Sequence, residues 1–204
     1  MKTNKTSLSR RAALGLLIIG LLTQPSYSSS LVEHASRKLE SNTKTFDSVH
    51  PTEVTPPLDT LPQTLSNLFA TPLAEAIRHS RDRIYTRGKP MPKEVRRRLA
   101  PFFPPTILDK VRYSTDWETA ADGSIYLLIL QSSSVQAVTL ADVILFHDEQ
   151  LVNDPLLWAH ELTHVEQYSR LGIPSFATQY LQQAWVLENE AITKADAIKN
   201  QLSP

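Results

Sequence analysis

The distribution of apolar and polar residues divides the chain into parts of different character. Residues 12–22 form an uninterrupted apolar run, whereas residues 29–63 are rich in Ser, Thr and Pro and have few apolar positions. A segment without a sustained apolar period cannot bury a core, so we predict a linker over residues 29–65. The remainder carries helical and strand-like patterns, which predict one folded domain over residues 66–204.

Helical patterns occur at both ends of this predicted domain. A Thr-Pro pair, followed by apolar residues on one face and a closing glycine, predicts a helix over residues 71–88. A short helix is expected over residues 94–99, and a helical turn or two over residues 107–113. Residues 175–200 contain neither glycine nor proline, and we predict that they form the last helix.

Between these helices lie stretches of β-branched and apolar residues separated by short polar breaks. They occupy residues 124–130, 135–140 and 142–146. Such runs are typical of short strands, so the sequence predicts two or three strands of a small sheet. Helices and a small sheet together indicate the α+β class.

The most sharply bounded predicted helix covers residues 156–170. Asn153-Asp154-Pro155 offers a capping side chain and then a proline in the first turn, where its missing N–H costs nothing. Gly172 and the proline two residues later provide a stop. No glycine or proline interrupts the stretch between these signals.

This helix contains the sequence His-Glu-Leu-Thr-His, an H-E-x-x-H motif, from His160 to His164. Positions four apart lie on one face of a helix, so both imidazoles can bind one metal ion. Glu161 lies one step round the helix and can act on a metal-bound water without ligating the metal. The alternative, an amphipathic helix with two incidental histidines, is weakened because the helix signals do not depend on the histidines.

A catalytic zinc site usually has three protein ligands and a water, so a third ligand is required. The chain has no cysteine, and the pattern with a third histidine fails because Gln167 and Arg170 stand where Gly and His would be needed. A carboxylate from the next helix remains, either Glu188 or Glu190. Residues two apart cannot both face the metal. We prefer Glu188, because the small Ala191 one turn later allows two helices to approach closely, and Glu190 remains the alternative.

Four further residues have suitable chemistry but no positional signal. His147 follows the last predicted strand and either polarises a substrate carbonyl or is simply a loop residue. Tyr168 and Tyr180 are oxyanion donors by residue type, and Asp196 has the chemistry to orient a ligand histidine.

Charge and cysteine content exclude several classes of function. The 21 basic and 21 acidic residues cancel, so no basic field indicates nucleic-acid binding. The absence of cysteine excludes disulfides, thiolate ligands and lipid attachment at a lipobox cysteine. Any metal must therefore be held by histidines and carboxylates. The sequence carries no signal for an oligomeric state.

The N-terminus has the features of a secretory signal, which we place at residues 1–28. Basic residues precede the apolar run of residues 12–22, which is too short to span a bilayer comfortably, and small residues occupy the two positions read by a signal peptidase. Residues 9–14 also resemble a twin-arginine export signal. We therefore expect a secreted or periplasmic protein with no stable membrane span after cleavage. An uncleaved segment would instead give a membrane-anchored accessory protein.

Two segments, residues 137–146 and residues 154–168, resemble a known bacterial family. It is the extracellular contractile injection system core domain, a predicted zinc-metallopeptidase-like domain of unknown function in which a short β-hairpin precedes an Ala-His-Glu-Leu-Thr-His-Val helix. The resemblance covers about residues 70–195, with Ala141 standing where the family usually has a glycine in the hairpin turn. It implies a small zincin-like domain in which the motif helix packs on the hairpin and the sheet edge lines the cleft.

These observations together predict a secreted zinc-dependent metallopeptidase acting on a peptide or protein substrate. Glu161 is the expected catalytic base, and the expected zinc ligands are His160, His164 and Glu188. The alternative is a non-catalytic binding or scaffold domain stabilised by the metal. In that case a protein group such as Glu166 or Glu190 would fill the fourth coordination position.

Overall fold

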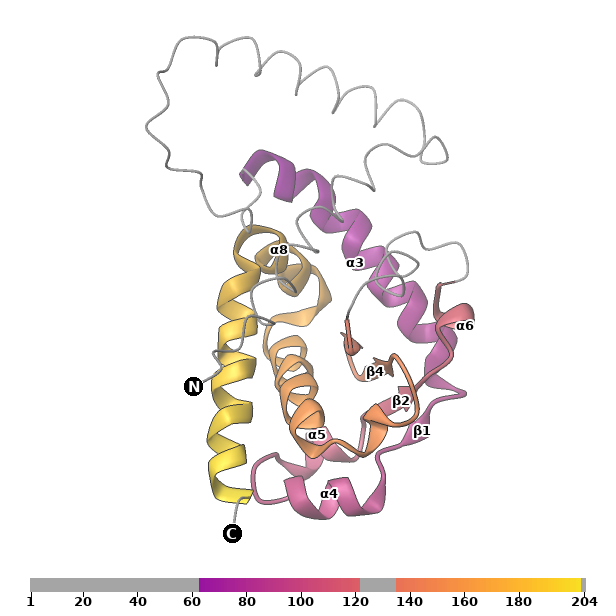
Figure 1. The fold of residues 1–204 in the computed structure, drawn as a ribbon. Coiled ribbons are helices and arrows are strands. Elements are labelled where there is room, and N and C mark those ends of the chain that lie inside the picture. Colours follow the sequence, from indigo (N-terminus) through magenta and orange to yellow (C-terminus); the bar gives the residue numbers. More distant parts are fainter. Residues whose placement is uncertain (1–62, 122–134, 203–204) are drawn as a thin grey trace. The chain divides into compact units, whose positions relative to one another are not determined.

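The structure is a computed structural model that describes residues 63–121 and 135–202 (Figure 1). All described residues belong to one compact unit, Asp59–Pro204. The predicted signal, most of the predicted linker and the strand predicted over residues 124–130 lie outside the described residues. Among the described residues, no helix is long and apolar enough to cross a membrane.

This unit combines helices with a small sheet, as predicted for an α+β domain. Its helices are α3 (Gln63–Tyr85), α4 (Lys93–Leu99), α5 (Pro105–Leu108), α6 (Trp117–Ala121), the 3-10 turn η1 (Leu151–Asn153) and the long α8 (Pro155–Leu202). Its strands are β1 (Lys89–Pro90), β2 (Arg112–Ser114), β3 (Ala137–Leu140) and β4 (Val143–Phe146), in the order β1-β2-β4-β3. β2 and β4 run parallel, and the other two pairs are antiparallel.

The predicted strands over residues 135–140 and 142–146 are confirmed as the β3–β4 hairpin. Leu140 pairs with Val143, so the turn has two residues, and Ala141 adopts a φ of 59° there. Turns of this length favour positive φ, which explains why a glycine suits this position. The carboxylate of the other turn residue, Asp142, accepts two hydrogen bonds from Arg81 of α3, at 2.7 and 2.8 Å. This ion pair fixes the hairpin to α3.

The predicted start of the first helix is wrong, because α3 already begins at Gln63 and passes through Pro72. A proline inside a helix removes one backbone hydrogen bond and costs about 3 kcal/mol. Packing offsets this cost, since one face of α3 is buried on both sides of the proline and α3 contacts α8. The buried residues of α3 at helical spacing are Ser66, Ala70, Ala74, Ile77, Ser80 and Ile84.

The helix predicted over residues 107–113 is also corrected. Its first part is helical in α5, but the chain then extends into β2, where Tyr113 pairs with Ile144 of β4. The buried Val111 and Tyr113 pack in the core beside this strand. The prediction failed because a pairing partner distant in sequence determines the conformation of this segment.

An aromatic cluster joins the sheet to the beginning of α8. Ring centroids lie 4.9 Å apart for Phe146 and Trp158, 5.7 Å for Tyr113 and Trp158, and 6.1 Å for Tyr113 and Phe146. Such tilted and edge-to-face arrangements are the favoured geometries of aromatic pairs. The Trp158 indole also donates to the carbonyl of Val152 at 2.7 Å. The helix turn just before the motif is therefore held firmly on the sheet.

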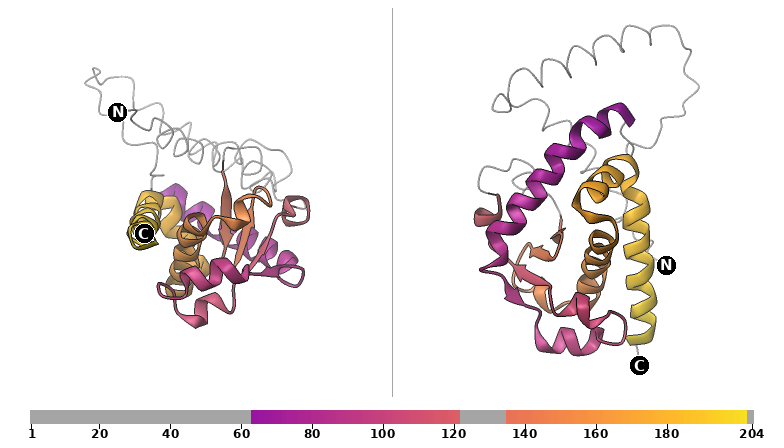
Figure 2. Two further views of the ribbon diagram at one scale, coloured as in Figure 1. Left: turned by 60° about the horizontal axis from the view of Figure 1, so that its bottom comes forward. Right: turned by 180° about the vertical axis from the view of Figure 1, so that it is seen from behind.

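α8 consists of three helical segments because two residues inside it have non-helical backbone angles. Gly172 has φ 74° and ψ 160°, and Gln183 has φ −150° and ψ 52°. The breaks fold the chain back, so that the third segment lies beside the first (Figures 1 and 2). The predicted stop at Gly172 and the helix predicted over residues 175–200 are thus confirmed, apart from the break at Gln183.

Candidate metal centre

The first segment of α8 begins as the sequence predicts. The Asp154 carboxylate accepts hydrogen bonds from the backbone N–H groups of Leu156, at 2.8 Å, and Leu157, at 3.3 Å. Pro155 occupies the first helical position. This cap and the buried Trp158 fix the helix on which the two motif histidines stand.

Three side chains from α8 converge on one point. The Nε2 atoms of His160 and His164 lie 3.1 Å apart. Glu188 places one carboxylate oxygen 3.4 Å from the Nε2 of His160 and the other 3.6 Å from the Nε2 of His164. All three potential ligand atoms lie within 4.8 Å of one another, so this group could hold a metal ion.

The donor set and its spacing suit zinc. Two imidazole nitrogens and one carboxylate oxygen are ligands that zinc accepts, at about 2.0–2.2 Å each. In a tetrahedral site with such bonds, neighbouring ligand atoms stand about 3.3 Å apart. The three observed separations of 3.1, 3.4 and 3.6 Å lie around this value. The two distances to Glu188 involve different carboxylate oxygens, so they show that the three side chains lie close enough to share one ion and not that three single atoms already form a tetrahedron.

Glu190, the alternative third ligand, points elsewhere. Its carboxylate forms a two-point ion pair with Arg170, at 3.1 and 2.9 Å, and accepts a hydrogen bond from Gln167 at 3.1 Å. Glu166, which was considered as a fourth ligand, pairs with Lys194 at 2.6 Å. Within the described part of the chain, the group therefore contains His160, His164 and Glu188 and no further acidic or histidine ligand.

Mutual attraction shifts the pKa values of two members of the group. Burial alone would lower the pKa of His160, but the hydrogen bond with Glu188 and the charges of Glu161 and Glu188 outweigh it, so this pKa is raised. Burial opposes ionisation of Glu188, yet the hydrogen bond with His160 and the charges of His164 and His160 lower the pKa of Glu188 to about 2. Glu188 is therefore ionised, as a metal ligand must be, at any physiological pH.

Glu161, the expected catalytic base, is nearly buried at 4 % exposure and is held by the sheet. Its Oε2 accepts a hydrogen bond of 2.7 Å from the hydroxyl of Thr139, and that hydroxyl also lies 3.2 Å from the Glu161 carbonyl oxygen. Thr139 belongs to β3, the last strand of the described sheet. Thr139 was not among the predicted site residues, because a threonine in a strand carries no signal of which side chain it meets.

The second unexpected residue is Gln167. Its Oε1 lies 2.8 Å from Nδ1 of His164, and its Nε2 donates to the Leu187 carbonyl at 2.9 Å. The only signal of this contact in the sequence is that Gln167 lies three residues after His164 on the same helix. In the sequence analysis, Gln167 was used solely to exclude the pattern with a third histidine ligand.

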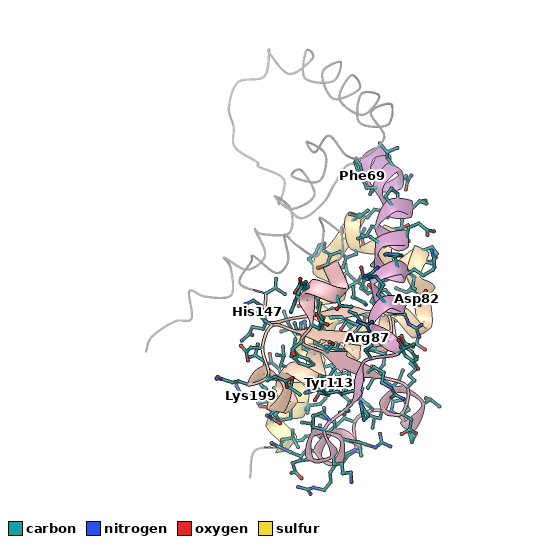
Figure 3. The ribbon with its side chains drawn as sticks, turned by 90° about the vertical axis from the view of Figure 1, so that its right-hand side faces the viewer. Phe69, Asp82, Arg87, Tyr113, His147 and Lys199 are labelled. Atoms are coloured by element: carbon teal, nitrogen blue, oxygen red, sulfur yellow. The ribbon has the colours of Figure 1, made fainter. Side chains whose placement is uncertain are left out.

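The four further candidates are placed differently. The hydroxyl of Tyr180 lies 3.4 Å from a carboxylate oxygen of Glu188, beside the potential ligands. Tyr168 is buried and stacks on Phe176 with ring centroids 3.7 Å apart. His147 is exposed at the margin of the domain (Figure 3), with its ring against Trp117, and is not a member of the ligand group. Asp196, which was considered for orienting a ligand histidine, is exposed, and the residue that contacts Nδ1 of His164 is Gln167.

Comparison with known protein families gives a match over the middle of the chain. The family model described as the eCIS core domain matches residues 90–172, which span β1 through the first segment of α8 and include the H-E-x-x-H motif. Glu188 lies beyond the matched residues. No curated protein and no solved structure matches the chain. The match confirms the resemblance found in the sequence, because residues 90–172 are similar to the eCIS core domain. That family is a predicted metallopeptidase-like domain, and in this chain His160, His164 and Glu188 could bind a metal ion.

Proposed function

We propose that this protein is a zinc-dependent peptidase that acts outside the cytoplasm. The observation that supports this most strongly is the convergence of His160, His164 and Glu188 at distances that allow one metal ion to be shared, without a fourth His, Asp or Glu ligand among the described residues. Catalytic zinc sites leave one position open for water or substrate, whereas structural sites are closed by a fourth protein ligand. The arrangement therefore favours an enzyme over a scaffold.

The scaffold alternative depends on a protein group that closes the site. Glu166 and Glu190 are the two carboxylates expected for that role, and both are engaged by cations away from the histidines. Moving either one to the site would break an ion pair and leave Lys194 or Arg170 without its acidic partner. Partly exposed ion pairs contribute only about 0–1 kcal/mol, so the argument against closure rests on position: both carboxylates are directed at cations and not at the histidines.

The chain supplies a base next to the ligands. A zinc ion held by His160, His164 and Glu188 would polarise the scissile carbonyl and lower the pKa of an attacking water to about 7. Glu161 takes the proton of that water and delivers it to the leaving amine. The Thr139 hydroxyl binds Oε2 of Glu161, which orients the carboxylate and leaves Oε1 to receive the proton. Because Glu161 is nearly buried, its charge is weakly screened.

The substrate we propose is a peptide or protein in extended conformation. β3 lies at the edge of the described sheet and carries Thr139, whose hydroxyl contacts the proposed base. An edge strand offers backbone donors and acceptors to which an extended peptide can be added as a further strand. This is the zincin-like arrangement that the family resemblance implies. The features of residues 1–28 support a secreted or periplasmic site of action.

The test compares the wild-type protein with Glu161→Gln, using Glu118→Gln at an exposed position of α6 as the matched control. Gln keeps the size of Glu and an oxygen that accepts from Thr139, so fold and zinc binding should persist. We expect one bound zinc per chain in all three proteins, measured by elemental analysis. Cleavage of a peptide library, followed by mass spectrometry, should fall by about 100-fold or more in Glu161→Gln alone. Equal cleavage by wild type and Glu161→Gln, or none by wild type, would refute the proposal.

A further inference from the structure

Gln167 is a polar side chain enclosed in the protein at 0 % exposure. It stands on the first segment of α8 and contacts the third segment through two hydrogen bonds, to the Leu187 carbonyl at 2.9 Å and to the Glu190 carboxylate at 3.1 Å. Its third contact, of 2.8 Å, is with Nδ1 of His164. A buried amide with all these contacts is fixed in one orientation, because leaving any of them unmade is costly.

The chemistry of these partners determines which end of the amide faces the histidine. The Leu187 carbonyl and the Glu190 carboxylate are both acceptors, and the pairing of Glu190 with Arg170 keeps that carboxylate ionised. Only the NH₂ group of Gln167 can face two acceptors. Its carbonyl oxygen must therefore face Nδ1 of His164, and this nitrogen must carry a hydrogen in order to donate.

This proton position leaves the other ring nitrogen of His164 free to bind a metal. A neutral imidazole has one N–H and one lone pair, so a proton on Nδ1 places the lone pair on Nε2. Nε2 is the atom that faces His160 and Glu188. The same tautomer also explains the contact between the two histidines, in which Nε2 of His160 donates and Nε2 of His164 accepts.

The contact with Leu187 extends this effect to a second ligand. Leu187 immediately precedes Glu188, so the hydrogen bond to its carbonyl holds the backbone from which Glu188 reaches the histidines. His164 and Glu188 stand on different helical segments, separated by the breaks at Gly172 and Gln183. One side chain thus orients two of the three potential ligands relative to each other.

We propose that Gln167 is a positioning residue that keeps His164 in its metal-binding tautomer and aligns Glu188 with it, supported from behind by Glu190 and Arg170. The inference rests on the metal site of the proposed function, but its claim about the tautomer concerns the metal-free protein as well. Partners that fix the tautomer of a metal-binding histidine typically change metal affinity by 10- to 100-fold when they are removed.

The test uses the full chain with Gln167→Met, which keeps the length of the side chain and removes its hydrogen bonds. Gln201→Met, at an exposed position near the end of α8, is the matched control. Zinc affinity is measured by competition with a chromophoric chelator, and we expect a 10- to 100-fold loss in Gln167→Met only. Long-range proton–nitrogen NMR of the metal-free protein should show the His164 proton on Nδ1 in wild type. In Gln167→Met it should move wholly or partly to Nε2.

A second pair of variants keeps the test decisive if Gln167→Met does not fold. Gln167→Glu still accepts from His164 but sets a carboxylate against Glu190, so zinc binding should weaken. Adding Glu190→Gln to Gln167→Glu restores a donor opposite residue 167. The double variant should bind zinc at least fivefold more tightly than Gln167→Glu alone. No recovery would count against the proposed network.

The outcomes separate this inference from the proposed function. If wild type binds no zinc, the proposed function fails, while the NMR experiment still decides the tautomer. If wild type binds zinc and Gln167→Met binds it as tightly, or keeps the His164 proton on Nδ1, Gln167 has no positioning role and the proposed function stands.

Discussion

Gly172→Ala is the substitution that most directly tests how the fold brings Glu188 back to the histidines. Gly172 ends the first segment of α8 with φ 74° and ψ 160°. This combination lies outside the left-handed helical region that Asn or Asp tolerates and is essentially restricted to glycine. Together with the break at Gln183, this change of direction allows the third segment of α8 to lie beside the first (Figure 2).

The structure indicates that the cost of this substitution is conformational and not a clash. A Cβ built on Gly172 would have Pro174 Cδ as its nearest neighbour, at 4.0 Å, which is ordinary van der Waals contact. Holding a non-glycine residue in such a backbone region costs about 1–3 kcal/mol. The smaller entropy of the unfolded alanine chain offsets about 0.4–1 kcal/mol of this cost. We therefore expect the free energy of unfolding of the zinc-bound protein to fall by about 1–2 kcal/mol.

The free energy of unfolding of the zinc-bound protein should fall by this amount whether the backbone of the variant keeps its conformation or relaxes. If the break keeps its geometry, the cost falls on the stability of the metal-free protein and zinc affinity stays the same. If the backbone relaxes, the third segment shifts, the separations of 3.4 and 3.6 Å between Glu188 and the histidines change, and the cost appears as weaker zinc binding. The free energy of unfolding at fixed free zinc contains both contributions.

The assay is urea unfolding at buffered free zinc, combined with chelator competition to divide the two contributions. Thr193→Ala, at an exposed site of the third segment, is the control and should change the free energy of unfolding by less than about 0.5 kcal/mol. If Gly172→Ala is as stable as wild type and binds zinc as tightly, residue 172 does not adopt this backbone conformation. The return of Glu188 to the histidines would then need a different cause.

Two further predictions concern the base and the ligands. Thr139→Val removes the hydroxyl 2.7 Å from Glu161, and a hydrogen bond to a charged group contributes about 1.5–3 kcal/mol, so kcat should fall by about tenfold or more with unchanged zinc affinity. Thr139→Ser should retain kcat. If steady-state kinetics give Thr139→Val the kcat of wild type, the proposed role of this contact is contradicted. The second prediction concerns the metal-free protein, in which the pKa of Glu188 is about 2 instead of 4.5, so its stabilising contribution is complete above pH 4.5 and is lost as the pH falls towards 2. The raised pKa of His160 stabilises the fold below its ordinary value of 6.5, and this contribution is lost as the pH rises through the folded value. Urea unfolding should therefore show the greatest stability between about pH 4.5 and 6.5. In Glu188→Gln the loss of stability below about pH 4.5 should be smaller than in wild type. A free energy of unfolding that does not change with pH would contradict both pKa shifts.

Elements bounded by local signals could be predicted from the sequence. The first segment of α8 begins at a capping Asp154 and ends at Gly172, and the hairpin follows from two apolar runs separated by a short break at Ala141. The backbone chemistry of a few neighbouring residues decides such boundaries, so no knowledge of distant contacts is needed.

Elements that depend on distant partners could not be predicted. Pro72 looks like a helix start in isolation, but burial of α3 against α8 carries the helix through it. Residues 112–114 are extended because β4 pairs with them, although their local sequence is compatible with a helix. In both cases tertiary packing outweighs local propensity by an amount that the sequence does not reveal.

The candidate site shows the same division. His160 and His164 are related by helical periodicity, so their convergence could be predicted. The third ligand could be narrowed to Glu188 or Glu190. Thr139 and Gln167 could not be identified, because each acts through a residue that lies near it only in the folded chain. Threonine in a strand and glutamine in a helix are ordinary choices, and nothing in their local pattern marks the contacts they make.

The proposed ligands and the proposed base have different supports, and this separation makes the two roles experimentally distinct. All three ligands stand on α8 and are aligned by contacts within it, through Gln167 and the break at Gly172. Glu161 is instead oriented from β3, through Thr139. Changes within α8 should therefore alter zinc affinity first, and changes at β3 should alter kcat at constant affinity. If Thr139→Val weakened zinc binding as much as Gln167→Met, the two supports would be coupled through the motif helix, and the aromatic cluster around Trp158 would be the contact most able to couple them.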